Sequence, residues 1–243
     1  MSEQKDILIR VIELIGKKLI DAEKILTELD SMGDADCGVG VRRGFEAVLN
    51  VVSELPQLEL GDILKKVGFT LAYTIGGTSG AMLGTGFIET GKYIADNKEP
   101  SVEDWIKAVD SALAVIKRRG GNTQVGDKTL VDALEPAVEA MKNAAGYELR
   151  AAGSSQVASD NAIDLSLNFQ QGLSSMQKDK NIYAVLDAAL SAAKEGSDKT
   201  VDMVARKGRA SYLGERSRGN RDPGSLVIVL MFEAAIEALR MSR

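Results

Sequence analysis

Apolar residues recur at helical spacing along most of the chain. In the stretch that follows Ser101 they mark one face of an amphipathic helix, which stops at Gly120 and Gly121. Ser101 is a favourable N-cap residue, and the acidic residues after it suit the positive end of a helix. Patterns of this kind predict eight main helices, at residues 3–29, 37–54, 60–74, 79–96, 102–119, 127–145, 181–196 and 224–241.

Three segments need separate treatment. Residues 226–232 are β-branched enough for a strand, but Asp222-Pro223-Gly224 supplies a helix start, so we predict a buried helix. Pro136 predicts a kink, or the end of an N-terminal turn, in the sixth helix. Residues 146–180 are rich in Ser, Ala, Gly, Gln and Asn and indicate an atypical insertion with one loosely held helix. No other linker divides the chain, so we predict a single all-α domain over 1–243, an up-and-down bundle.

Composition excludes several mechanisms. The chain has no histidine, so it contains no Ser-His-Asp triad, no histidine-ligated zinc site and no phosphohistidine. A net charge of −5 argues against a general nucleic-acid role. The single cysteine, Cys37, cannot form an internal disulfide, and the sequence shows neither a signal peptide nor a membrane-length apolar run. We therefore expect a cytoplasmic protein that uses neither nucleic acid nor membrane as a partner.

Three aspartates, Asp30, Asp34 and Asp36, lie within seven residues in a predicted loop. Carboxylates this close repel one another unless a cation lies between them, and an all-oxygen ligand set favours a hard divalent cation. A solvated acidic turn, in which one aspartate caps a helix, explains the same residues equally well.

A glycine-rich run, Gly76-Gly77-Thr78-Ser79-Gly80, lies between two predicted helices. Glycines allow close backbone approach, and the start of a helix offers free N–H groups, a combination that suits phosphate. A flexible turn with Ser79 as N-cap is the simpler alternative. The run Gly126-Asp127-Lys128-Thr129 opens the sixth helix in the same way, with Asp127 as its predicted N-cap.

A basic segment covers residues 206–221 and runs into Asp222. Arginine suits bidentate phosphate contact, so this segment indicates a local anion site in an otherwise acidic chain. The alternative is a solvated loop whose charges pair with Glu215 and Asp222.

The topology predicts that these loops meet. In an up-and-down bundle every second connection lies at the same end. The loops at 30–37, 75–79, 120–127 and 206–223 follow the first, third, fifth and seventh predicted helices. Carboxylates for a cation, a backbone cradle for phosphate and an arginine-bearing loop at one end of the bundle predict a site for a magnesium nucleotide.

The same four stretches resemble the L subunit, or L domain, of dihydroxyacetone kinases. The matching residues are Gly33 to Gly38, Gly76 to Gly80, Gly126 to Thr129, Arg206 to Ser217, and Asp222 to Gly224. The resemblance implies an eight-helix barrel that binds ADP or ATP through two Mg²⁺ ions held by Asp30, Asp34 and Asp36. It also implies phosphoryl transfer to dihydroxyacetone, or a similar short ketose, held on a separate K subunit.

The resemblance further implies roles for single residues. Arg209 would be catalytic, stabilising charge on the transferred group. The nucleotide would be bound by Cys37, Gly38, Val39, Gly40, Thr78, Ser79, Gly121, Leu130, Arg209, Asp222, Pro223 and Gly224. The chain departs from the family in two respects. One residue fewer separates Asp30 from Asp34, and Cys37 and Asn220 stand where the family often has histidine.

Without histidine, the chain can neither tether dihydroxyacetone covalently nor carry phosphohistidine, so we expect the nucleotide half of a split enzyme. In many bacterial systems of this family a histidine phosphocarrier subunit rephosphorylates bound ADP, whereas single-chain relatives use ATP as a substrate. The sequence is compatible with both, and with a homodimer. Two alternatives stay open: a non-catalytic nucleotide-sensing adaptor that docks through 146–180, and the nucleotide domain of a fatty-acid kinase, which the signature at 207–217 disfavours.

Overall fold

The structure is a computed structural model that describes residues 3–146 and 167–242. These residues form nine α-helices and four short 3₁₀ helices (η), with no strand among them, which confirms the all-α prediction. The α-helices are α1 (Glu3–Asp21), α2 (Glu23–Leu29), α3 (Cys37–Asn50), α4 (Leu60–Thr74), α5 (Gly77–Tyr93), α6 (Val102–Arg119), α7 (Val131–Ala144), α9 (Leu167–Lys199) and α10 (Pro223–Met241). The 3₁₀ helices are η1 (Asp30–Met32), η2 (Val52–Gln57), η3 (Thr200–Asp202) and η4 (Arg209–Ser217).

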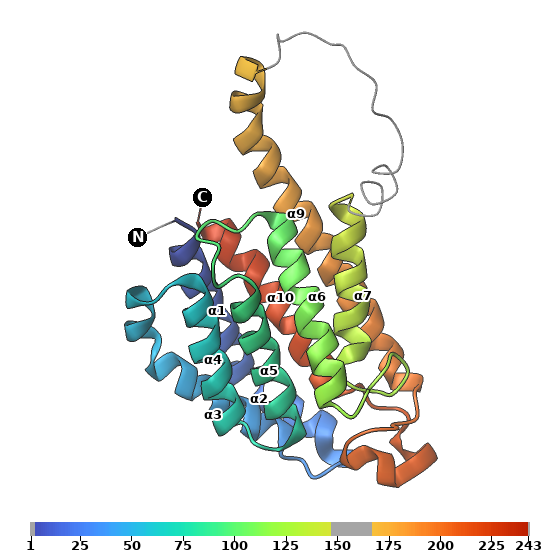
Figure 1. The fold of residues 1–243 in the computed structure, drawn as a ribbon. Coiled ribbons are helices and arrows are strands. Elements are labelled where there is room, and N and C mark those ends of the chain that lie inside the picture. The colour runs from blue at the N-terminus through green and yellow to red at the C-terminus, as the bar shows by residue number, and fades with distance from the viewer. Residues whose placement is uncertain (1–2, 147–166, 243) are drawn as a thin grey trace.

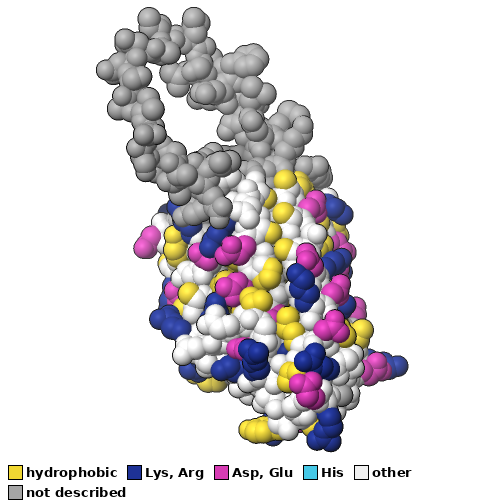
Figure 2. Space-filling model, turned by 90° about the vertical axis from the view of Figure 1, so that its right-hand side faces the viewer, with side chains coloured by type: hydrophobic (Ala, Val, Ile, Leu, Met, Phe, Trp, Pro, Cys, Tyr) yellow, Lys and Arg dark blue, Asp and Glu magenta, His cyan; other side chains and the backbone are white. Residues whose placement is uncertain are grey.

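The helices form an elongated bundle with both termini near its upper end in Figure 1. Helix α4 packs on α5, α5 on α6 and α7 on α9, while α10 packs against α1, α7 and α9. Leu226 to Val229 are buried consecutively in α10, so the ambiguous β-branched run is the buried helix we predicted. No helix within the described residues is both long enough and apolar enough to span a bilayer. The face in Figure 2 interleaves basic, acidic and hydrophobic side chains, without a large area of one charge.

The predicted first helix is two helices, which corrects the count of eight. The chain bends at Ala22, although hydrogen bonds from Ala22 N to Lys18 O and from Leu26 N to Ala22 O continue across the bend. The bend changes which residues face the core. Ile25, part of the predicted apolar face, is 49% exposed, whereas Leu26 is fully buried.

The helices α7 and α9 also differ from the prediction. Helix α7 begins at Val131, four residues after the expected start, and contains Pro136. Proline cannot donate to the carbonyl oxygen of Asp132 four residues earlier. Gly196 of α9 packs on that oxygen, and a Cβ added to Gly196 would lie 2.0 Å from it. Helix α9 starts at Leu167 and is continuous with the helix predicted at 181–196. The rest of the predicted insertion, residues 147–166, lies outside the described residues.

Glycines let α4 and α5 approach backbone to backbone. A Cβ added to Gly68 would lie 2.6 Å from the carbonyl oxygen of Gly84, and one added to Gly84 would lie 2.6 Å from that of Gly68. Gly61 and Gly91 face each other in the same way, with corresponding distances of 2.6 and 2.5 Å. This seam fixes the position of the loop that joins the two helices.

Candidate functional site

The four loops meet at the lower end of the bundle in Figure 1, as the topology predicts. The Nε of Arg209 lies 2.8 Å from Asp34 Oδ2, which joins η4 to the acidic loop. The Nζ of Lys207 donates to the carbonyl oxygen of Gly121 over 2.8 Å. A Cβ added to Gly40 would lie 3.0 Å from the carbonyl oxygen of Ile75, so the start of α3 touches the glycine loop.

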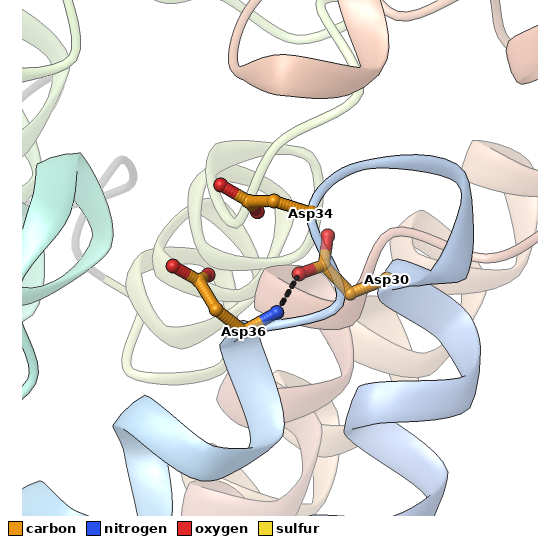
Figure 3. A group of neighbouring side chains, drawn as sticks. All are labelled: Asp30, Asp34 and Asp36. Carbon is orange, nitrogen blue, oxygen red and sulfur yellow. Dashed lines mark hydrogen bonds between the residues drawn. The ribbon is translucent and has the colours of Figure 1, made fainter.

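The three aspartates converge (Figure 3). One carboxylate oxygen from each of Asp30, Asp34 and Asp36 lies within 4.8 Å of the other two. Asp30 Oδ2 accepts hydrogen bonds from the backbone N–H groups of Asp36 (3.1 Å) and Cys37 (3.0 Å). The shorter spacing after Asp30 therefore still delivers its carboxylate to the cluster, and the same side chain secures the start of α3.

Burial and mutual repulsion both change the pKa values of the carboxylates in the cluster. Burial, followed by the charges of Asp34 and Asp36, raises the pKa of Asp30 above its usual range. Partial burial and the neighbouring Asp34 raise the pKa of Asp36, although Arg209 and Arg43 oppose this rise. A divalent cation would relieve this repulsion, and three carboxylates are a donor set that Mg²⁺ accepts. The residues present therefore fit the metal implied by the sequence.

The first turn of α3 offers backbone donors beside the aspartates. The first helical hydrogen bond runs from Gly40 N to Asp36 O over 2.8 Å, so the N–H groups of Gly38 and Val39 precede it. No side chain fits at Gly38, where an added Cβ would lie 2.2 Å from both Glu23 O and Thr27 Oγ1. The pKa of the half-buried Cys37 thiol is raised by burial and by the nearby aspartates. A raised pKa disfavours the thiolate form that a nucleophilic cysteine needs.

The glycine loop presents a second helix start. Gly76 and Gly77 have φ values of 85° and 58°, and Gly76 occupies the N-cap position of α5. Ser79 is consequently not the N-cap; it lies with Thr78 in the exposed first turn. The first helical hydrogen bond runs from Gly80 N to Gly76 O, which leaves three N–H groups before it. These groups suit phosphate oxygens.

Asp127 does not cap α7, contrary to the prediction. Its carboxylate accepts from Gln124 N over 2.9 Å and so closes the turn before the helix. Asp132, inside the first turn of α7, anchors the loop instead. It is 1% exposed and accepts from Gly126 N (2.6 Å) and Thr129 N (2.7 Å). Leu130, a predicted adenine neighbour, is buried at the end of this loop.

The segment Asp222-Pro223-Gly224 starts α10 beside this loop. Asp222 is the N-cap, and its Oδ2 accepts from Ser225 N over 2.6 Å, as the sequence predicts for a helix start. A Cβ added to Gly224 would lie 3.3 Å from Leu130 Cβ, so the two predicted nucleotide-binding segments are adjacent. Desolvation is the main cause that raises the pKa of Asp222 to about 7, and the charge of Asp132 adds to it.

Sequence reasoning assigned no role of its own to two charged residues beneath the site and to one at its edge. Lys128 and Asp132 are buried, and Arg43 donates to the carbonyl oxygens of Thr74 (2.6 Å) and Ile75 (2.7 Å) at the glycine loop. An acidic residue in the first turn of a helix was a usable signal for Asp132. Lys128 and Arg43 act on partners at least 31 positions away, which no local pattern reveals.

A family model for the DAK2 domain matches residues 31–163 and 141–237, two overlapping stretches that cover most of the chain. The chain belongs to the DAK2 domain family. It is 33% identical over 210 residues to the ADP-binding subunit DhaL of a PEP-dependent dihydroxyacetone kinase from Escherichia coli, covering 86% of this chain and 84% of that protein. It is 30% identical over 238 residues to a Listeria innocua subunit of the same description, covering 98% of each.

Longer relatives and solved structures extend the comparison. An L-erythrulose 1-kinase from Mycolicibacterium smegmatis is 28% identical over 96% of this chain, which spans 35% of that protein. The crystal structure of the dihydroxyacetone kinase of C. freundii superposes with a TM-score of 0.64 at 23% identity, covering 95% of this chain and 34% of that one. The structure of that kinase with AMP-PNP and Mg²⁺ gives a TM-score of 0.63. These superpositions establish that the DAK2 chain shares its fold with one third of a larger kinase.

Proposed function

We propose that this chain is the nucleotide-binding subunit of a cytoplasmic dihydroxyacetone kinase. It would bind ADP or ATP with Mg²⁺ and pass a phosphoryl group to dihydroxyacetone, or a similar short ketose, held on a separate K subunit. The observation that carries the proposal is the convergence of three carboxylates within 4.8 Å where two helix starts and an arginine-bearing loop meet. The names of the E. coli and Listeria relatives, both ADP-binding subunits, support the same assignment.

In this proposal Asp30, Asp34 and Asp36 hold two Mg²⁺ ions, which when bound neutralise charge on the phosphates. The free N–H groups at the starts of α3 and α5 donate to phosphate oxygens. Arg209, beside Asp34, stabilises charge on the group in transfer. Leu130 and Gly121 lie by the adenine, and the start of α10 closes the nucleotide site.

No general base is needed on this chain if the acceptor is activated on its own subunit, and the absence of histidine agrees with that division. The phosphoryl donor is either an ADP that stays bound and is rephosphorylated by a phosphocarrier subunit, or an ATP that exchanges. Relatives described as PEP-dependent and PTS-dependent favour the first route. Native mass spectrometry of the purified chain separates the two routes, because retained ADP adds its mass to the protein.

Calorimetric titration with ADP and Mg²⁺ tests the metal site. Asp34→Asn and Asp36→Asn should each weaken binding at least tenfold, about 1.4 kcal/mol, because each removes a carboxylate from the cluster. Asp62→Asn is a matched control, since this exposed aspartate lies in the first turn of α4 and pairs with Lys65. Equal affinity in the wild type and both cluster variants would rule out this metal site. Nucleotide binding without transfer to any ketose-loaded K subunit would indicate a sensor instead.

A further inference from the structure

One buried side chain joins the two ends of residues 203–217, which we call the basic loop. The Nζ of Lys128 donates to the carbonyl oxygens of Met203 (3.3 Å) and Ser217 (2.5 Å). Lys128 is only 7% exposed, and its φ of 63° is left-handed. A buried ammonium group and a left-handed non-glycine residue are both unfavourable, so their coincidence at one residue points to a functional constraint.

Other hydrogen bonds join the two ends of the loop, and we call this joined region the neck. Ser217 Oγ accepts from Ala205 N over 2.8 Å and donates to Gly214 O over 2.6 Å. Arg206 N donates to the carbonyl oxygen of Asp127, the residue before Lys128, over 3.0 Å. The neck is therefore a closed set of buried or half-buried hydrogen bonds between the basic loop and the segment that precedes α7.

The tip of the loop is held far less firmly. Lys207 reaches Gly121 O through an exposed hydrogen bond, and the side chain of Arg209, which pairs with Asp34, is 72% exposed. Exposed ion pairs contribute only about 0–1 kcal/mol, whereas hydrogen bonds from a buried charge contribute more. The position of Arg209 therefore depends on the neck more than on its own ion pair.

We propose that Lys128 is a positioning residue that holds the basic loop across the acidic cluster and sets Arg209 beside Asp34 before ligand binds. The role of Arg209 in this inference rests on the proposed function, but the closure of the loop does not. Replacing Lys128 with methionine removes the ammonium group that hydrogen-bonds to both ends of the loop, at Met203 and at Ser217. The ends should then separate while the helices stay folded.

Limited trypsin digestion of the ligand-free chain tests the closure. Arg206, Arg209 and Arg216 are exposed, and cleavage beside them requires local opening, so its rate reports how often the loop opens. Lys128→Met should raise cleavage within 203–217 at least tenfold and leave cleavage elsewhere unchanged. Lys142→Met is the matched control; this lysine of α7 pairs with Asp110 over 2.7 Å and should give the wild-type rate.

An unchanged cleavage rate in folded Lys128→Met, or an increase spread over the whole chain, would overturn the inference. If Lys128→Met does not fold, Ser217→Ala tests the same neck, because it removes two hydrogen bonds there and should also raise loop cleavage.

A double-mutant cycle separates positioning from general stability. Lys128→Met and Arg209→Ala should each weaken the affinity for ADP with Mg²⁺ about tenfold, and the double variant should bind little worse than either single one. Fully additive losses would show that Lys128 does not act through Arg209. If the wild type binds no ADP, the proposed function fails, while the digestion still decides whether Lys128 closes the loop.

Discussion

The glycine loop and the basic loop bring groups to the same end of the molecule, but different forces hold them there. The glycine loop joins α4 and α5, whose backbones touch at Gly68 and Gly84. The basic loop contains only η4 and is anchored by polar contacts to Lys128 and by the Ser217 hydroxyl. The glycine loop is positioned mainly by close packing, to which Arg43 adds hydrogen bonds at Thr74 and Ile75, whereas the basic loop is positioned by hydrogen bonds.

This difference has consequences for motion and for mutation. Close backbone packing does not depend on pH, and it is lost only when the helices separate. A loop held by hydrogen bonds can open by itself while the bundle stays folded. Substitutions in the seam should therefore lower the free energy of unfolding, whereas substitutions in the basic loop should change ligand binding at nearly constant stability.

The largest effect is expected from Gly68→Ala. The added Cβ would lie 2.6 Å from Gly84 O and 2.7 Å from Ile88 Cγ1, and a backbone oxygen cannot move aside without parting the helices. Overpacking of this kind costs about 1–3 kcal/mol, and we expect the upper end of that range because backbone is involved. Urea unfolding measures the loss.

Gly208→Ala in the basic loop is the matched control. Nothing lies within 4 Å of its added Cβ, so the cost is only the backbone strain of its φ of 67° and ψ of −171°, a conformation that favours glycine. That strain is worth about 1–3 kcal/mol, and it should appear mainly as faster loop opening. A global loss as large as that of Gly68→Ala would break the distinction between the two regions.

An intermediate effect, dependent on pH, is expected from Asp222→Asn. Asp222 has a native pKa of about 7, against an ordinary value of 3.8. Between these values the native state keeps a proton that the unfolded state has lost, so this group lowers stability as pH rises from about 4 to 7. Asparagine stays neutral and can still cap α10. Between pH 4.5 and 6, which is about one and a half units inside this window, the variant should therefore gain about 2 kcal/mol over the wild type, since each unit is worth about 1.4 kcal/mol.

Urea unfolding at pH 4.5, 6 and 7.5 measures this gain. The loss caused by Gly68→Ala should be the same at all three pH values, because the atoms nearest to the added Cβ belong to Gly84 and Ile88, which do not titrate. Parallel stability curves for the wild type and Asp222→Asn would contradict the account of Asp222.

The sequence predicted the regular parts of the fold best where local signals agree. The bounds of α6 were predicted correctly because Ser101 and Asp104 form a capping box and Gly120 follows the last turn. Topology predicted that the four loops meet. The bend at Ala22 was missed because helical hydrogen bonding continues across it, so the helical pattern does not stop there. Only the apolar spacing changes, by one residue.

The parts that could not be predicted depend on contacts distant in sequence. The glycines of α4 and α5 carry no local signal that they face each other. Lys128 contacts Met203 and Ser217, which follow it by 75 and 89 positions, so its burial depends on the completed fold. The sequence therefore predicted which loops meet at one end of the bundle, while the residues that support those loops were not predicted.

The smallest effect on stability is expected from substitutions of the exposed arginines. Arg209→Ala removes a largely exposed ion pair with Asp34 and should change the free energy of unfolding by less than about 0.5 kcal/mol. Its effect should appear in function, as weaker binding of ADP or a slower chemical step even at saturating K subunit. Calorimetry and single-turnover assays measure these two quantities.

Arg218 and Arg221, which directly follow the basic loop, can be compared with Arg209 inside it. Arg218 contacts Glu215 and the carbonyl oxygen of Asp202, and Arg221 pairs with Asp198, so both are held by their own neighbours and not by the acidic cluster. Rim charges chiefly alter association rate and its salt dependence. The double variant Arg218→Ala/Arg221→Ala should keep the affinity for ADP and raise the K-subunit concentration needed for half-maximal rate. Loss of ADP binding in the double variant, with binding retained in Arg209→Ala, would reverse the roles assigned to these arginines.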